Sequence, residues 1–556
     1  MPKTLSFLRR CVAATTLWLF ALPIALAQAP PPKATLLKEG VRAAVEVTAM
    51  DLDVVAAKDG KPVTDLKKEE LRVRVDGREF PLDYFARLDA GTVYGPDLAT
   101  ASPDLILETT QTGDDRYLPR QFMVFFDDEH LMPFDRKRVI EGLRDFVTRL
   151  TPSDRMALVS YNVSMKVLVP FTNSKEALSD GLLKLENSAP RGLYWESQYR
   201  QDVNQARRYS SFTRQGQSNR DAIIRSYGQQ IRGREQGTLN EFRRAIAALA
   251  ARSGKRVLIY VSNGIELHPG QTFSQSLGSN QLDQWDQSVV QEYQKAIAEA
   301  NKSGVTIHSL DARGLTTDVD AGESEPPAID QFLNDVNRRE ALAGFADETG
   351  GALVQNRNTF PSSLDRIYRD SSSYYSLGVT LSNLDPKKKE HSVEVTTTRP
   401  GVKLRTRRSY GARTADDAAR DRMEMALMTP DARGEFPVTL QTGVPTKKDA
   451  GMGRRLVPLE VKIPLSELTF LEEAGKKKAV IEVMLAAVED TGARSDPEPL
   501  RETILLEPDA LAKKPDAVWI VARPAKSRTG NMRFVATVRD IATNRIGVAS
   551  ASIRVE

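Results

Sequence analysis

Between residues 119 and 370 the sequence alternates buried strands with amphipathic helices. Phe122–Phe126 (FMVFF) is a continuous apolar run, and Val257–Val261 is a second one. Such runs are typical of parallel strands that are covered on both faces. Phe134–Leu150 lies between them and has apolar residues at helical spacing. Repeated units of this kind predict a doubly wound α/β sheet, whose ligands bind at the carboxyl ends of the strands.

The rest of this region continues the pattern. We expect a hairpin at Met156–Tyr161 and Lys166–Val169, helices at Lys175–Leu185, Leu239–Arg252, Val289–Ser303 and Val336–Thr349, a strand at Val305–Leu310, and closing segments at Ala352–Gln355 and Phe360–Asp370. Three polar excursions interrupt these elements, at Asn187–Gln236, Glu266–Gln287 and Leu315–Asp330, the last with Asp318, Asp320, Glu323 and Glu325. All three are expected at the ligand-binding edge, where enlarged loops build binding surfaces.

The flanks of this region have the period-two pattern of β-strands. Residues 41–88 and 371–412 are two such segments, and we expect them to pair into one β domain because the ends of an inserted domain lie close together. Residues 89–118 are polar and rich in Gly, Asp and Pro, which predicts a linker. Residues 413–556 are predicted to form an all-β, sandwich-like domain.

The amino-terminal segment predicts export. Residues 1–27 have the pattern of a secretory signal peptide, with Lys3, Arg9 and Arg10 before an apolar run and Ala25-Leu26-Ala27 at its end. Residues 28–40 then form a short leader. The single cysteine, Cys11, lies within the signal. The formal net charge of the whole chain is only +4, which argues against nucleic acid as the ligand. We expect a bacterial protein of the periplasm or cell surface.

From the order of these elements, residues 122–370 resemble a von Willebrand factor type A (VWA) domain. The flanking sequences DGKPVTDLKKEELRVRVDG and YYSLGVTL…HSVEVTTTRPGVKLRTRRSYG resemble those around the VWA domain of an exported VWFA-related family described in Acidobacteria. The resemblance covers roughly residues 40–412. It implies a Rossmann-like domain that binds a partner at the carboxyl edge of its sheet.

The resemblance also implies a metal-ion-dependent adhesion site, of which this sequence keeps only part. By position, the family's ligands fall on Asp127, Glu129, Thr238 and Asn263, whereas Leu131 takes a serine position and offers no oxygen. Hard cations such as Mg²⁺ or Ca²⁺ need oxygen ligands. The site is therefore degenerate. Either it holds a divalent cation with help from Asp128, or it is an acidic cluster that caps loops.

The 187–236 insertion is the second candidate binding element. The insertion has nine arginines but only four acidic residues. Five aromatic residues lie among the arginines, Trp195, Tyr199, Tyr209, Phe212 and Tyr227. Arginine with aromatic residues is typical of protein interfaces. The candidate partner contacts are Asp128, His130, Trp195, Tyr199, Arg207, Arg208, Tyr209, Arg214 and Tyr227. A polyanionic ligand and a solvated helical excursion with locally paired arginines are the alternatives.

No sequence motif for catalysis is present in the chain, and its four histidines lack a metal-ligand spacing. We therefore expect a non-enzymatic binding or adhesion protein with an unidentified protein partner. One alternative is a structural or assembly component of the envelope with a decayed metal site. The other is a hydrolase that uses Asp127, Asp128 and Glu129 with a metal ion.

Overall fold

The computed structural model describes residues 48–90, 92–94, 110–112, 115–209, 211–279, 288–314, 327–382, 384–385, 387–446, 451, 453–473 and 475–556. The predicted signal peptide and leader lie outside these ranges, as do Asp318, Asp320, Glu323 and Glu325 of the predicted 315–330 loop. Residues Glu46–Glu556 form one structural unit. In the described ranges, no helix is long and apolar enough to cross a membrane.

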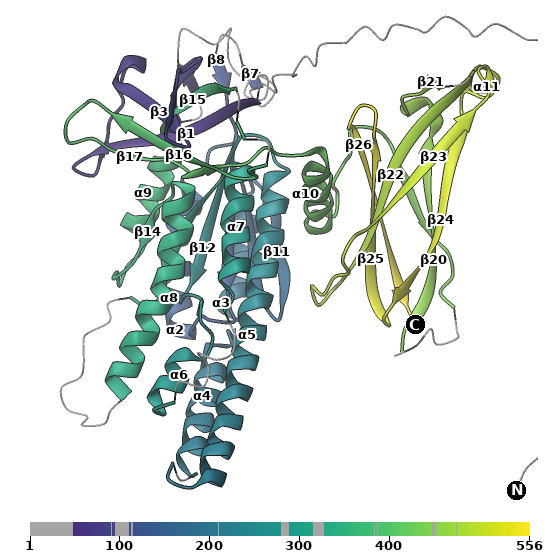
Figure 1. Cartoon of the computed structure of the whole chain (residues 1–556). Coiled ribbons are helices and arrows are strands. Elements are labelled where there is room, and N and C mark those ends of the chain that lie inside the picture. Colours follow the sequence, from purple (N-terminus) through teal and green to yellow (C-terminus); the bar gives the residue numbers. More distant parts are fainter. Residues whose placement is uncertain are drawn as a thin grey trace, which may run out of the picture. The chain divides into compact units, whose positions relative to one another are not determined.

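A six-stranded sheet is the centre of the 119–370 region (Figure 1). Its strands, in spatial order, are β11 (Ser164–Thr172), β10 (Arg155–Asn162), β9 (Arg120–Asp127), β12 (Lys255–Ser262), β13 (Val305–Asp311) and β14 (Leu353–Val354). Five strands are parallel, and the edge strand β11 runs antiparallel to β10. The chain thus starts in the middle of the sheet and winds outward on both sides, which confirms the predicted doubly wound α/β architecture.

Helices cover both faces of this sheet. One layer contains α2 (Pro133–Thr148), α3 (Lys175–Glu186) and α9 (Pro361–Ser372), and the other contains α5 (Arg214–Ala250), α7 (Val290–Lys302) and α8 (Pro327–Thr349). Strand β9 shows why its sequence is continuously apolar. Phe122, Val124 and Phe126 belong to the core under the first layer, and Met123 and Phe125 to the core under the second.

The 187–236 insertion forms a helical hairpin that extends past the carboxyl ends of the strands (Figure 1). It consists of α4 (Gly192–Arg207) and the first part of α5. The sequence predicted a helix at Leu239–Arg252 and helical content within the insertion, and α5 joins the two as one helix that starts at Arg214 and has 37 residues, about 55 Å. The short helix α6 (Gln271–Ser276), in the predicted 266–287 loop, packs against the hairpin.

The two flanking β segments share their sheets. Strand β1 (Thr48–Lys58) pairs with β15 (Ser373–Leu381), placing Leu52 opposite Leu377, and β3 (Leu71–Val75) pairs with β16 (His391–Thr397). The other strands are β2 (Lys61–Pro62), β4 (Arg78–Phe80), β5 (Tyr84–Asp89), β6 (Thr92–Tyr94), β7 (Thr110–Thr112), β8 (Asp115–Tyr117), β17 (Lys403–Arg405) and β18 (Ser409–Tyr410). Strands β6 to β8 lie in the predicted 89–118 linker, which therefore contributes to the sheet.

The sequence predicted that residues 413–556 are all-β. This was wrong for the start of the region, which forms helix α10 (Ala415–Met428). Two antiparallel sheets follow and share one hydrophobic core. Their strands are β19 (Thr439–Thr442), β20 (Arg455–Pro464) and β24 (Val518–Ser527) in one sheet, and β21 (Leu471–Glu473), β22 (Lys476–Glu489), β23 (Glu498–Leu506), β25 (Gly530–Asp540) and β26 (Ile546–Val555) in the other. A short helix, α11 (Ala510–Lys513), precedes β24.

Candidate functional site

Asp127 ends strand β9 at the carboxyl edge of the sheet, and its side chain is fully buried. Its Oδ2 atom accepts hydrogen bonds from Tyr260 Oη at 2.7 Å and from Ser262 Oγ at 2.8 Å. The Nδ1 atom of His130 lies 2.8 Å from the same oxygen. Two hydrogen bonds and one ion-pair contact therefore reach Oδ2, whereas Oδ1 is buried without a hydrogen bond from the described residues.

His130 belongs to a buried chain of alternating charges. Its Nε2 atom lies 2.9 Å from Glu235 Oε2, and Arg234 Nε donates to Glu235 Oε1 at 3.1 Å. Arg234 Nη2 lies 3.7 Å from Glu266 Oε1, which accepts a hydrogen bond from Arg338 Nη2 at 2.7 Å. Buried charges are tolerated when they are paired in this way, and removing one partner is strongly destabilising.

These charges shift the titration of the groups in the chain. Burial by itself lowers the pKa of His130. The negative charges of Asp127 and Glu235 outweigh this effect and raise the pKa to about 9. Burial raises the pKa of Glu235, and the positive charges of Arg234 and His130 bring it down to about 2. At neutral pH, His130 is therefore an imidazolium between two carboxylates. A positive charge of the protein itself lies beside Asp127, at the edge where the resemblance implied a metal ion.

Glu129, the second predicted metal ligand, has both carboxylate oxygens occupied. Its Oε1 atom accepts hydrogen bonds from the Val163 backbone N–H at 2.9 Å and from Arg191 Nη1 at 2.8 Å. Its Oε2 atom accepts a hydrogen bond from Trp195 Nε1 at 2.7 Å. Glu129 therefore joins the sheet edge to the start of the hairpin.

The other two predicted ligands also have partners of their own. Thr238 Oγ1 donates to the backbone oxygen of Arg234 at 3.1 Å, and Asn263 Nδ2 donates to Asp135 Oδ2 at 2.9 Å. In the part of the chain that the structure describes, no group of three His, Cys, Asp or Glu side chains is arranged to hold a metal ion. Donors of the protein itself occupy both Glu129 carboxylate oxygens and Asp127 Oδ2, whereas Asp127 Oδ1 and Asn263 Oδ1 are buried without a hydrogen bond from the described residues.

Asp128 points to a third set of partners. Its Oδ1 atom accepts a hydrogen bond from Arg136 Nη1 at 3.1 Å, and its Oδ2 atom accepts one from Ser160 Oγ at 2.6 Å. Burial raises the pKa of Asp128, and the positive charge of Arg136 opposes that shift. The carboxylates of residues 127, 128 and 129 thus face three different environments.

Three of the predicted partner contacts are structural parts of the hairpin. The Tyr227 side chain is buried, and its ring centroid lies 4.2 Å from that of Phe273 in α6. Tyr199 contacts both rings edge-on, with centroids 5.9 Å from Tyr227 and 5.7 Å from Phe273. Trp195 packs against the same small core while it donates to Glu129. Tyr227 is therefore buried in this core, and Trp195 and Tyr199 are half-buried against it. Asp128 and His130 are buried at the sheet edge.

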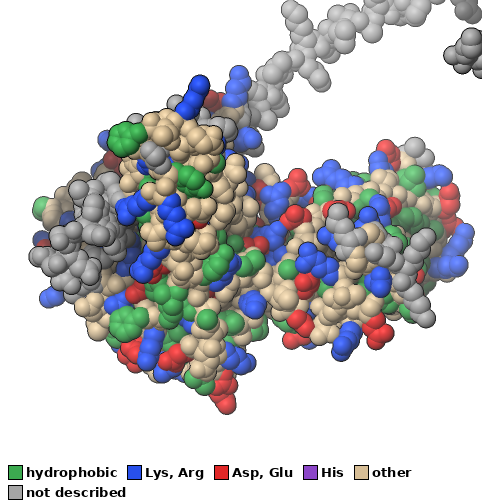
Figure 2. Space-filling model, turned by 90° about the horizontal axis from the view of Figure 1, so that it is seen from below, with side chains coloured by type: hydrophobic (Ala, Val, Ile, Leu, Met, Phe, Trp, Pro, Cys, Tyr) green, Lys and Arg blue, Asp and Glu red, His purple; other side chains and the backbone are tan. Residues whose placement is uncertain are grey.

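The other predicted contacts lie together at the end of the hairpin. We call residues 207–209 and 211–214 the hairpin tip. Arg207, Arg208 and Arg214 are exposed there, as is Tyr209. Phe212, which the sequence analysis noted but did not select, is 96% exposed. Between Asp202 and Asp221 the sequence has four arginines and no acidic residue. Figure 2, seen from below, shows hydrophobic side chains exposed beside lysine and arginine side chains.

A second exposed aromatic group lies where the hairpin leaves the sheet edge, and the sequence analysis missed it. Leu193 and Tyr194 are 57% and 52% exposed. The guanidinium of Arg191 lies 4.8 Å from the centroid of the Tyr194 ring, and the Arg191 backbone N–H donates to the Asp128 carbonyl. The alternation of arginine and aromatic residues in RGLYW was the available signal for this group.

No protein-family model and no curated protein sequence matches the chain. Solved structures similar to it include an aerotolerance-related membrane protein from Bacteroides fragilis, at 12% identity over 46% of this chain and 98% of that one, with a TM-score of 0.23. A von Willebrand factor type A protein from Catenulispora acidiphila is 10% identical over 86% of this chain and 74% of that one, with a TM-score of 0.23. The mussel byssus protein PTMP1 with a zinc-occupied MIDAS motif is 12% identical over 46% of this chain and 48% of that one, with a TM-score of 0.22.

The identification of the fold comes from topology. The first strand lies at the centre of the sheet, the edge strand β11 is antiparallel, and helices cover both faces. This is the arrangement that the resemblance implied for residues 122–370. The chain therefore contains a von Willebrand factor type A-like domain.

Proposed function

We propose that this protein is an exported, non-enzymatic binding protein that holds a partner protein at the hairpin tip. The observation that carries the proposal is the 96% exposure of Phe212 next to Arg207, Arg208 and Arg214. An exposed phenylalanine gains about 25 cal/mol for each Å² of apolar surface that a partner covers. Aromatic residues and arginine supply much of the binding energy in protein interfaces.

The tip is held by a preformed support. The small core of α4, α5 and α6, with Tyr227 and Phe273 at its centre, joins the two arms of the hairpin. The carboxyl-terminal third of α5 is anchored on the sheet through Leu239, Phe242 and Ile246. A contact residue on a preformed support loses less conformational freedom on binding, so more of its contact energy appears as affinity.

The charge of the tip defines the chemistry of the partner. Because arginines are the only charged residues between Asp202 and Asp221, the tip favours an acidic surface with an apolar pocket for Phe212. Guanidinium groups bind carboxylates in bidentate geometry. In this proposal they receive the partner's carboxylates directly, which is the task of the metal ion in a metal-dependent adhesion site. Binding is expected to be independent of metal and to weaken at high salt.

Export and the absence of catalysis are parts of the same proposal. The support for export is the pattern of residues 1–27. The support for a non-enzymatic role is that the carboxylates of Asp127, Asp128 and Glu129 are each engaged by donors of the protein itself. The envelope structural component remains the second candidate, and it is supported by the buried ion pairs of His130 at the edge where the metal site was expected.

The test is site-specific photo-cross-linking in the native host. A photoreactive phenylalanine analogue at position 212 is compared with the same analogue at Val444, which is 87% exposed and remote in sequence. We expect a discrete cross-linked protein from position 212 and not from position 444. The charge reversal Arg207→Glu with Arg208→Glu should abolish the product. The matched control, Lys184→Glu with Lys403→Glu, makes the same change in net charge at other exposed sites and should preserve it.

The partner is then purified, and its affinity for the two double variants is measured. At least a tenfold loss with the tip variant alone is expected, because each charge-assisted hydrogen bond contributes on the order of 1.5–3 kcal/mol. Equal affinity of both variants would overturn the proposal. A product that forms at position 212 but survives the charge reversal would also contradict it.

A further inference from the structure

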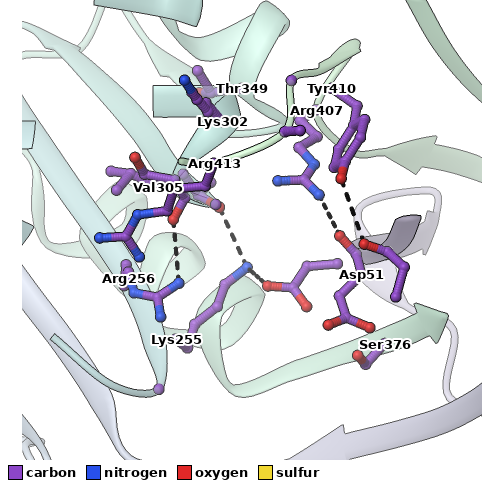
Figure 3. Close-up of a pocket in the computed structure, with 18 of the residues that line it drawn as sticks. Asp51, Lys255, Arg256, Lys302, Val305, Thr349, Ser376, Arg407, Tyr410 and Arg413 are labelled. Atoms are coloured by element: carbon purple, nitrogen blue, oxygen red, sulfur yellow. Dashed lines mark hydrogen bonds and ion pairs between the residues drawn. The ribbon is translucent and has the colours of Figure 1, made fainter. Parts of the chain in front are cut away.

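A cavity and a sheet edge of the described structure differ in whether their polar groups have partners. The cavity, of about 440 Å³, is bordered by strands β1, β12 and β13 and by the segment 407–413. Within it, Lys255 Nζ lies 2.5 Å from Asp53 Oδ2, and Arg407 donates to the Asp51 carbonyl (Figure 3). These charged side chains are held by the protein itself, whereas the sheet edge at β24 has backbone groups that no described strand pairs with.

Strand β24 forms one edge of the three-stranded sheet in the carboxyl-terminal region (Figure 1). It pairs with β20 along its whole length, from Val518 opposite Pro464 to Ser527 opposite Arg455, and no other described strand pairs with it. In an antiparallel pair, the backbone groups of alternate residues point toward the partner strand, and those of the residues between them point away. Every second residue of β24 therefore directs its backbone groups out of the sheet.

Pro458 of β20 shows which residues of β24 face outward. Its carbonyl accepts a hydrogen bond at 2.8 Å from the N–H of Gly443, which directly follows β19 on the other side of β20. Pro458 lies opposite Pro524 in the register, so this pair makes no hydrogen bonds between β20 and β24. By alternation, the residues whose N–H and C=O groups point out of the sheet edge are Val518, Ile520 and Ala522.

The side chains of these three residues are apolar and exposed. Val518 and Ile520 are 47% and 49% exposed, and Ala522 is exposed as well. On the same face of the sheet, β20 has Lys462 opposite Ile520 and Glu460 opposite Ala522. The β20 part of this face is thus polar, as expected next to water, whereas the edge strand is apolar. An apolar row with open backbone groups is a template for pairing with another strand.

Other edges of the same sandwich are protected against such pairing. Strand β23 has the charged residues Arg501 and Glu502. Strand β26 is contacted by the segment before β19, where the Glu435 N–H donates to the Ile546 carbonyl at 2.7 Å. Charged residues and covering segments are the usual means of blocking an edge strand. In β24 the first charged residue is Arg523, which follows five uncharged residues, VWIVA.

We propose that β24 pairs with β24 of a second copy of this chain, antiparallel and about a two-fold axis at Ile520. In this register Ile520 lies opposite Ile520 of the other copy, and Val518 lies opposite Ala522. Each of these pairs exchanges N–H···O=C bonds in both directions, because both of its members face outward. An axis one residue further along, at Val521, brings Val518 opposite Pro524, which has no N–H to donate. Pro524 therefore sets the register.

The segment 518–522 complements itself, and for this reason its partner is a second copy. In the register centred on Ile520, each apolar side chain meets another apolar side chain, and the segment contains no charge that could repel its own copy. A two-fold axis also closes the assembly at two copies, because the free β24 edge of each copy is then paired. This interface is independent of the hairpin tip.

The test is sedimentation velocity of the purified full-length chain from about 1 µM to about 200 µM, because an interface made by one added strand is small and weak. Ile520→Lys and Ile520→Glu each place two like charges opposite each other at the axis. Leu505→Lys is the matched control, since Leu505 is 57% exposed on β23 in the other sheet. Thermal unfolding of each variant verifies its folding.

We expect a monomer–dimer equilibrium for the wild type and an unchanged one for Leu505→Lys. The dissociation constant should rise at least about tenfold for each Ile520 variant alone. An equimolar mixture of the two Ile520 variants should regain the dimer, because a lysine of one copy then lies opposite a glutamate of the other.

A wild type that stays monomeric at the highest concentration would overturn the proposal. Undiminished association of either Ile520 variant would do so too, because the copies would then meet elsewhere. A mixture of the two variants that stays monomeric would contradict the axis at Ile520.

Discussion

His130→Gln removes the buried positive charge between Asp127 and Glu235. In an unfolded chain histidine titrates near 6.5, whereas the pKa of His130 in the folded protein is about 9. Because folding raises this pKa, the ion pairs stabilise the fold fully below pH 6.5. That stabilisation is lost as the pH rises through 9. At about 1.36 kcal/mol for each pKa unit, the loss amounts to about 3 kcal/mol.

The assay is urea unfolding of the wild type and the variant from about pH 6 to about pH 10. The difference between their unfolding free energies isolates His130, because other titrating groups contribute to both proteins. We expect this difference to be largest at the acidic end and to fall by about 3 kcal/mol across the range. His268→Gln is the control, because it makes the same substitution at an exposed position. A flat difference for His130→Gln would refute the reasoning, because it would mean that His130 is neutral in the folded protein.

Three further predictions follow from the same contacts. Phe212→Ser should leave the unfolding free energy within about 0.5 kcal/mol of the wild type, since the side chain is 96% exposed, and should weaken partner binding in a titration. Tyr227→Ala should destabilise the hairpin by about 3 kcal/mol because it empties a buried ring position, and limited proteolysis should then cut within 192–237. Millimolar Mg²⁺ or a chelator should leave the thermal midpoint of the wild type unchanged. A rise of the midpoint with Mg²⁺ would contradict the inference that His130, and not a metal ion, supplies the positive charge beside Asp127.

The central sheet was predictable from sequence because its signals are local. Strand β9 is apolar at every position that contacts either helix layer. Five consecutive apolar residues are therefore enough to predict its burial on both faces. Helix α10 had a local signal that was overlooked. Thr414 and Asp417 form a capping box, and Ala419, Met423 and Ala426 follow at helical spacing. The early start of α5 had a weaker signal in Ile224, Tyr227 and Ile231.

The chemistry of the sheet edge was not predictable in the same way. His130 is 105 residues from Glu235 in sequence, and only the folded chain brings them into contact. The position-by-position comparison with the metal site identified Asp127 but said nothing of Tyr260, which donates to it from the neighbouring strand. Likewise the composition of the insertion indicated an interface, but tertiary packing decides that Tyr227 is buried and Phe212 is exposed.

The most direct test of the central claim, a metal-free edge with binding at the hairpin tip, is cross-linking from position 212 in two conditions. The reaction is run with a chelator and with millimolar Mg²⁺, on wild-type background and on His130→Gln. We expect the same product in equal yield in both conditions for the wild-type background, because arginines and Phe212 make the contact and His130 supplies the charge at Asp127. A product that forms only when Mg²⁺ is present would contradict the account.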